Sequence, residues 1–262
     1  MKRQCDRLFF DILTVISGIR SGFLLDYGRL EASLFADLVG SISANFGLEV
    51  CIVTSGDCCI LVAPKLLILQ GLRFISFRTP NDTTMALPEW LPHPVQMLQR
   101  LDGVKRFLQS VVNKAGYSSN ARTVQVVRAN ALPGCPCMPT LHGFLLGYPV
   151  IYVVHDLEEA ERASRCLSTC SLRLYCLTSS LDLNFGTNLG IEDMTILCFS
   201  APESLCNDTS DGDVDSELMM KAVLQEWLAV TTRRHSIAVE HGGVPWGALK
   251  MSQTTRMCGV AL

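Results

Sequence analysis

The chain has 262 residues, of which 48% are hydrophobic and 18% are charged, and its formal net charge is −3 with a pI near 6.0. Globular proteins usually carry about 25% charged residues, so this balance favours an ordered protein with much buried sheet and excludes a disordered chain. A weakly acidic protein has no basic field to attract nucleic acid, so we expect no nucleic-acid partner.

The N-terminus reads as an amphipathic helix. It opens with Met-Lys-Arg, as a signal peptide can, but the charged residues Asp6, Arg7 and Asp11 fall where such a peptide needs its apolar region. Apolar residues recur on one face instead, at Leu8, Ile12, Val15, Ile16 and Ile19. No stretch elsewhere has the roughly 18 continuous apolar residues of a membrane span, so we expect none.

The chain has twelve cysteines, several of them within apolar runs that look like strands, such as Cys51, Cys176 and Cys198. In such runs a cysteine behaves as a small hydrophobic residue. Without an export signal, reduced thiols and a cytoplasmic location are the simpler interpretation.

The first half of the chain predicts a series of short strands and two longer helices. After the N-terminal helix, helical spacing appears over Leu30–Phe46 and Val95–Lys114, and Thr79–Pro94, with its four prolines, is predicted as a loop. The predicted strands are Phe23–Tyr27, Leu48–Thr54, Cys58–Ala63, Lys65–Leu69, Arg73–Phe77 and Thr123–Arg128.

A Pro/Gly-rich break over Leu132–Pro139 precedes a second series of elements. Asp156 is suited to cap a helix that runs to about Ser168, and a further helix is predicted over Asp213–Val230. The predicted strands are Val150–Val154, Leu172–Thr178, Met194–Phe199 and an edge strand at Ser236–Glu240. Since Val150–Val154 is a continuous apolar run, we expect it to be a central strand.

The predicted fold class is α+β, a mixed sheet with helices on its faces. Each half, 1–131 and 140–262, reads as strand, helix, strand, strand, helix, strand, which is the order of a ferredoxin-like unit. Two such half-units are one interpretation, and a single irregular α+β domain is the other. Because the connector has only eight residues, we expect 1–262 to form one compact domain in either case.

Polar side chains gather around a glycine-proline turn at Gly147-Tyr148-Pro149. Gly147 is expected to adopt a conformation that a Cβ would resist, and Pro149 to fix the entry into the following strand. His142 and His155 flank this stretch, so His142, Tyr148 and His155 are candidates for an acid/base site. The structural alternative is two loop histidines that bond to the backbone.

Two further sets of residues are candidates for a metal site or a catalytic site. Cys135 and Cys137 with His142 have a spacing that resembles part of a zinc site, but no second pair of ligands accompanies them, so no metal is expected. Asp26 lies at the end of the predicted strand Phe23–Tyr27, where α/β enzymes often place a carboxylate. The sequence has no phosphate-binding glycine loop, and we expect no cofactor.

The stretch LHGFLLGYPVIYVV at 141–154, together with Leu24-Leu25-Asp26-Tyr27-Gly28 and the overall size, resembles an uncharacterised eukaryotic family. That family is named after an open reading frame on human chromosome 1, and its domain is of unknown function. The resemblance implies a soluble intracellular protein and supplies no catalytic residues.

Two classes of function follow from the sequence. The first is a non-catalytic interaction module that binds a protein partner, not identified by the sequence, through a sheet edge or an apolar groove. The second is an enzyme with a site near His142, Tyr148 and His155. Converging polar groups in one pocket would favour the enzyme, and an exposed apolar patch would favour the module.

Overall fold

The computed structural model describes residues 2–26, 30–44, 46–79, 86–92, 94–116, 124–183, 189–206, 214–241 and 244–257. Over these residues the helices are α1 (Lys2–Ile16), α2 (Ala32–Ser43), α3 (Val95–Gly116), α4 (Met138–Leu145), α5 (Leu157–Thr169) and α6 (Val214–His241). The strands are β1 (Gly22–Leu25), β2 (Cys51–Ser55), β3 (Cys58–Val62), β4 (Arg73–Arg78), β5 (Leu87–Trp90), β6 (Gln125–Arg128), β7 (Val150–Tyr152), β8 (Ser171–Leu183), β9 (Leu189–Pro202) and β10 (Lys250–Met257). The predicted α+β class is confirmed.

The first sheet is covered by helices on both faces. Its strand order is β1-β3-β2-β6, and alternate side chains of one strand point to opposite faces. Ile52 and Leu61 pack with α1 and α2, whereas Val53 and Ile60 pack with α3. This double burial explains why the strands read as continuous apolar runs.

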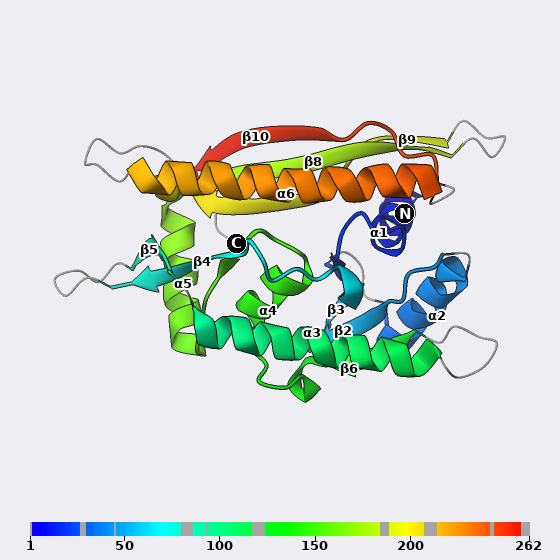
Figure 1. The fold of residues 1–262 in the computed structure, drawn as a ribbon, viewed down its shortest axis with the longest axis horizontal. Helices are drawn as coiled ribbons and strands as arrows, with labels where there is room; N and C mark the ends of the chain where they lie inside the picture. The colour runs from blue at the N-terminus through cyan, green and yellow to red at the C-terminus, as the bar shows by residue number, and fades with distance from the viewer. Residues whose placement is uncertain are drawn as a thin grey trace.

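Two three-stranded sheets complete the fold. In the second sheet, with order β5-β4-β7, strand β7 runs parallel to β4 and joins the two halves of the sequence. The third sheet, with order β10-β8-β9, is antiparallel, and α6 lies along one of its faces. In the view of Figure 1 the long helices α3 and α6 run roughly parallel, and α4 appears between them.

The ferredoxin-like half-units are not confirmed. Strands β1, β3 and β2 with α2 do form the first part of such a unit, because β3 lies between two strands antiparallel to it. However, β6 pairs in parallel with β2, whereas a ferredoxin-like unit places its last strand beside the first. In the second half, β7 belongs to a different sheet from β8, β9 and β10.

Several predicted elements need correction. Strand β7 lies at the edge of its sheet and not at the centre, although Val150, Ile151 and Val154 are buried. Helix α6 continues to His241, so the strand predicted at Ser236–Glu240 is wrong.

Three further corrections concern the loops. A short 3-10 helix at Pro64–Leu66 replaces part of the strand predicted at Lys65–Leu69. The predicted proline-rich loop contains β5. The predicted break at Leu132–Pro139 already contains the start of α4.

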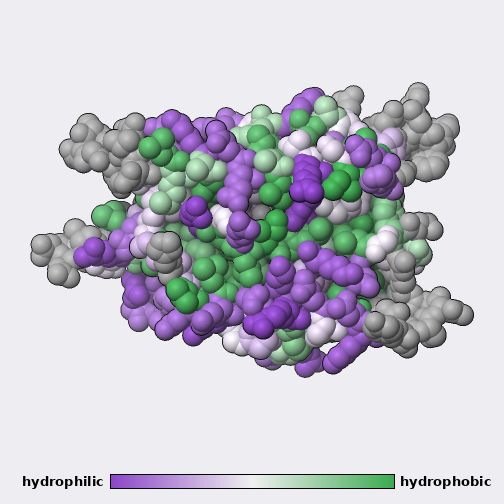
Figure 2. All heavy atoms as spheres, viewed as in Figure 1, coloured by the Kyte–Doolittle hydropathy of each residue, from purple (hydrophilic) through white to green (hydrophobic). Residues whose placement is uncertain are grey.

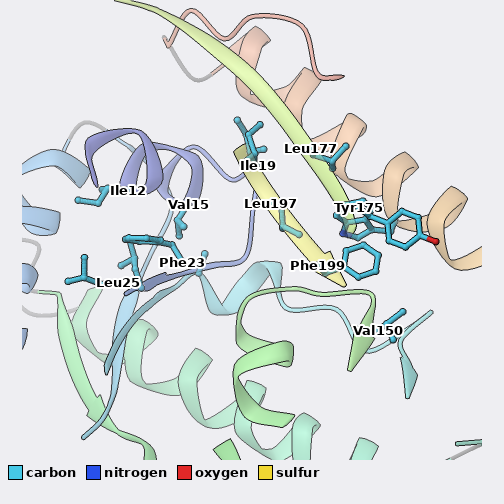
Figure 3. Packing of buried hydrophobic residues seen from close by; sticks show 14 of the residues in the cluster. Ile12, Val15, Ile19, Phe23, Leu25, Val150, Tyr175, Leu177, Leu197 and Phe199 are labelled. Atoms are coloured by element: carbon cyan, nitrogen blue, oxygen red, sulfur yellow. The ribbon is translucent and has the colours of Figure 1, made fainter. Parts of the chain in front are cut away.

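The hydrophobic core continues from the first sheet to the third. Figure 3 shows Ile12 and Val15 of α1 near Phe23 of β1, and Leu197 and Phe199 of β9 near Tyr175 of β8. The Phe199 ring stacks on Tyr175 with 5.1 Å between centroids. None of the helices in the described ranges is long and apolar enough to cross a membrane.

A buried ion pair ties α1 to the sheets. The Asp11 carboxylate, which is 0% exposed, accepts hydrogen bonds from Arg7 Nε at 2.7 Å and from Arg20 Nη1 at 3.3 Å. Arg20 also donates from Nε to the Gly22 carbonyl of β1 at 2.6 Å and from Nη1 to the Ile196 carbonyl of β9. One guanidinium thus connects α1, β1 and β9.

We predict that Asp11→Ala will lower the free energy of unfolding by about 3–5 kcal/mol, because it leaves the buried Arg20 guanidinium without its carboxylate. The matched control is Asp102→Ala, which removes an exposed pair with Arg106 and should cost less than about 1 kcal/mol. Urea unfolding of both variants measures the difference. An equal loss of unfolding free energy in the two variants would show that the buried pair stabilises the protein no more than the exposed pair does.

Candidate functional site

The LGYP segment is the C-terminal stop of helix α4. Pro139 lies in the first turn of this helix, where its missing N–H costs nothing. At the other end, Gly147 N donates to Phe144 O at 3.1 Å and Tyr148 N donates to Gly143 O at 3.0 Å. These two bonds form a Schellman motif, which requires a left-handed residue at Gly147. The proline near the start and the glycine after the end are the sequence signal that would have revealed α4.

Gly147 has φ +75°, which confirms the predicted backbone conformation. A Cβ at this position would overlap the Oγ of Ser21, and a Cβ on Gly22 would overlap the carbonyl oxygen of Leu145. The end of α4 therefore lies directly against the start of β1. Beyond the turn, the Pro149 carbonyl accepts a hydrogen bond from Arg73 N at 3.0 Å, which leads the chain into β7 beside β4.

The turn forms one wall of a cleft of about 260 Å³, which we name the α6 cleft. Helix α6 forms the opposite wall, and residues 66–72 close one side. The lining is mostly apolar and includes Ile19, Leu66, Leu197, Val223, Trp227 and Val230. On the face that contains α6 and α3, a band of hydrophobic surface runs between their polar surfaces (Figure 2).

A few polar groups interrupt this apolar lining. Arg234 of α6 donates from Nη2 to the Leu66 carbonyl at 2.6 Å, and burial lowers the pKa of its guanidinium. Thr231 Oγ1 donates to the Trp227 carbonyl one turn earlier in the helix at 2.9 Å. Glu226 lies against Gly71, whose φ is +77°. Sequence reasoning missed all of α6 as a site, although Val223, Trp227, Val230 and Arg234 recur at helical spacing.

Tyr148 also lines a second cleft of about 160 Å³, which we name the Asp26 cleft. The two clefts share Arg20, Tyr148 and Leu197. Burial raises the pKa of the Tyr148 phenol, the Arg20 charge opposes this shift, and Cys198 and Asp26 add to it. The structure therefore brings two of the predicted candidates, Tyr148 and Asp26, to one place.

The two candidate histidines lie elsewhere. His142 is half-buried on α4, burial lowers the pKa of its imidazole, and Nε2 has no hydrogen-bond partner in the described part of the chain. His155 is exposed, and its backbone N–H donates to Glu159 Oε2 at 2.8 Å. Neither histidine lines the α6 cleft or the Asp26 cleft.

The candidate metal ligands Cys135 and Cys137 precede α4, with Cys137 at its N-cap. Burial raises the pKa of the Cys135 thiol, and the neighbouring Cys137 adds to this shift. A thiol with a raised pKa is a weaker metal ligand, since the thiolate binds the metal. No three His, Cys, Asp or Glu side chains are placed to hold a metal ion within the described ranges.

A serine-histidine pair escaped the sequence analysis. Ser179 Oγ on β8 lies 3.5 Å from His235 Nε2 on α6 and donates to the Gly247 carbonyl at 2.8 Å. Ser179 is 0% exposed, so no substrate can reach its hydroxyl without rearrangement. This pair links α6 to the third sheet.

A comparison with protein families identifies the chain. The model of the family described as a domain of unknown function (DUF4504) matches residues 1–255, so the chain belongs to that family. No curated protein matches the chain, and no solved structure does. The expected domain of unknown function is thus confirmed, and the site rests on its geometry alone.

We predict that Gly147→Ala will destabilise the protein by about 1–3 kcal/mol, because alanine resists a positive φ and its Cβ meets Ser21. Tyr148→Phe should cost little, since no described residue hydrogen-bonds to the hydroxyl. Gly47→Ala is the control, because nothing lies within 4 Å of a Cβ there. The measurement is the melting temperature of the three variants. An unchanged melting temperature in Gly147→Ala would contradict a structural role for Gly147 in the turn.

We predict that stability falls as the pH drops below about 6.5, in part because of His142. Burial lowers its pKa in the folded state, so the unfolded state binds the proton more readily. The stabilisation that neutral His142 contributes is complete above the pKa of this residue in the unfolded state. It is lost as the pH falls toward the lower pKa of the folded state. His142→Gln should therefore flatten the pH dependence of urea unfolding, and an unchanged pH dependence in this variant would contradict the prediction.

Proposed function

We propose that this member of the family is a non-catalytic interaction module that holds a small ligand in the α6 cleft. The observation that carries the proposal is the cleft itself, a mostly apolar hollow with several polar groups between α6 and the LGYP turn. Such a composition is typical of sites that bind small molecules.

The volume of the cleft supports a small occupant. An apolar cavity of about 150 Å³ is large enough to bind benzene, and the α6 cleft has about 260 Å³. This space accommodates a ring or a short chain with one polar group. A long peptide would need a groove that extends well beyond this length.

The lining residues favour binding over catalysis. No histidine or cysteine lines the α6 cleft among the described residues, and the Thr231 hydroxyl is engaged by the Trp227 carbonyl. Nucleophilic or acid/base chemistry needs a reactive group within hydrogen-bond reach of its base. The α6 cleft offers no such pair in the described part of the chain.

A sheet edge is a weaker docking surface. The outer strand β10 is exposed at residues 250–255 and carries mostly polar side chains, with Lys250 at its start. Polar residues and lysine are the devices by which proteins prevent pairing at an edge. We therefore assign the interaction to the cleft.

An enzyme is the second candidate function, with its site in the Asp26 cleft and not at the two histidines. Tyr148 and Asp26 line the Asp26 cleft with Arg20 beside them, so a phenol and a carboxylate share one cleft, although burial raises the pKa of the phenol and weakens it as an acid or base at neutral pH. The role expected for His142 and His155 finds no support in their positions. An enzyme of this kind would lose its turnover in Tyr148→Phe at unchanged melting.

We also propose a cytoplasmic location with reduced thiols, as the cysteine pattern of the sequence suggests. The structure has no disulfide between the cysteines that it describes. The likeness to the eukaryotic family named after a human chromosome 1 reading frame adds no chemistry to the proposal.

The cleft is tested with Nile red, a neutral apolar dye that fluoresces in apolar surroundings. We expect the wild type to bind it and Val230→Asp to bind it at least about tenfold more weakly, since a carboxylate in the apolar lining costs more than about 1.4 kcal/mol. Val239→Asp is the matched control, because Val239 is 46% exposed on the same helix and does not line the cleft. Equal binding by both variants would contradict the proposal.

A further inference from the structure

The α6 cleft contains a cation whose charge is not balanced by a nearby acid. Arg234 is half-buried, and its guanidinium donates a hydrogen bond to a neutral acceptor, the Leu66 carbonyl. No carboxylate lies within ion-pair distance of it among the described residues. Among the other partly buried arginines, Arg20 pairs with Asp11 and Arg173 with Glu203, while Arg73 donates to the Leu72 carbonyl and does not line the α6 cleft.

The lack of a paired acid beside Arg234 favours the binding of an anion in the cleft. A guanidinium that is partly removed from water loses hydration, and a carboxylate restores that loss through two parallel hydrogen bonds. Burial lowers the pKa of Arg234, which reports the same loss of hydration. An anion that enters the cleft therefore gains more from Arg234 than it would from an exposed arginine.

The remaining lining defines the rest of the ligand. Val223, Trp227 and Val230 precede Arg234 on the same helix and present apolar surface. Glu226 lies two turns before Arg234, which is about 12 Å along the helix axis. Its negative charge at that end disfavours a second negative charge on the ligand, so a phosphate or a dicarboxylate fits less well.

We propose that the α6 cleft binds a small monocarboxylic acid, with the carboxylate on Arg234 and the apolar body against Trp227 and Val223. This inference rests on the proposed function, because it assigns a chemical class to the ligand of the same cleft. The planar fork of the guanidinium matches a carboxylate, which makes arginine the suitable residue.

The test compares octanoate with its neutral isostere octanamide on the full chain by isothermal titration calorimetry at pH 7.5. We expect the wild type to bind octanoate at least about tenfold more tightly than octanamide. Arg234→Met should abolish this preference, and Arg234→Lys should reduce it because the fork is lost. Arg233→Met is the control, since Arg233 is the exposed neighbour on the same helix.

Nile red binding to the same variants shows whether the cleft is intact. If octanamide binds as tightly as octanoate to the wild type, or if the preference survives in Arg234→Met, the carboxylate inference is overturned. Binding of Nile red without any binding of octanoate also overturns it and leaves the proposed function standing. If the wild type binds neither octanoate nor Nile red, both proposals fail.

Discussion

The buried pair of Asp11 and Arg20 is the interaction on which the arrangement of the sheets depends. A single guanidinium reaches a carboxylate on α1, a carbonyl on β1 and a carbonyl on β9. The low-dielectric surroundings make each of these contacts strong and make any unpaired group costly. The first and third sheets are therefore fixed relative to each other by geometry that few other side chains could reproduce.

This constraint also positions the functional surface. Arg20 is followed by Ser21 and Gly22, the two residues against which the end of α4 packs. The LGYP turn is thus held at the point where β1 begins, and Tyr148 contacts Phe199 of β9 with ring centroids 6.3 Å apart. Phe199 in turn meets the edge of Trp227 on α6 at 5.1 Å. The walls that α6 and the LGYP turn form are therefore continuous with the core, and the loop at residues 66–72 closes the remaining side.

Local features of the structure could be predicted from the sequence. Asp156 caps α5 as expected, and its side chain accepts a hydrogen bond from Glu159 N at 2.8 Å. The strands of the first sheet were found because burial on both faces leaves long apolar runs. In contrast, α4 was hidden, since Gly143 and the Gly147-Tyr148-Pro149 turn interrupt the apolar pattern with residues that favour turns. Strand β10 was missed because it is exposed and mostly polar.

The site depends on contacts that no local pattern encodes. Tyr148 and Asp26 were singled out from their turn and strand positions, and the tertiary fold brings them together. The proposed role of Arg234 could not be identified from the sequence. It depends on the hydrogen bond to the Leu66 carbonyl and on the absence of a nearby carboxylate in the described chain. A role for His142 and His155 stays a prediction from their proximity in the sequence, and neither of them lines the α6 cleft or the Asp26 cleft.

The parallel pairing of β4 with β7 has a consequence for how the protein folds. Its register joins Arg73 to Val150, and the whole of α3 and the first sheet's last strand lie between them in the chain. Such a non-local pairing has a high loop-closure entropy and slows folding. Helix α6 follows both strands in the chain, so the cleft between it and the LGYP turn also depends on non-local contacts. A ligand that fits the cleft therefore binds only where these non-local contacts have formed, and it stabilises the finished fold by mass action.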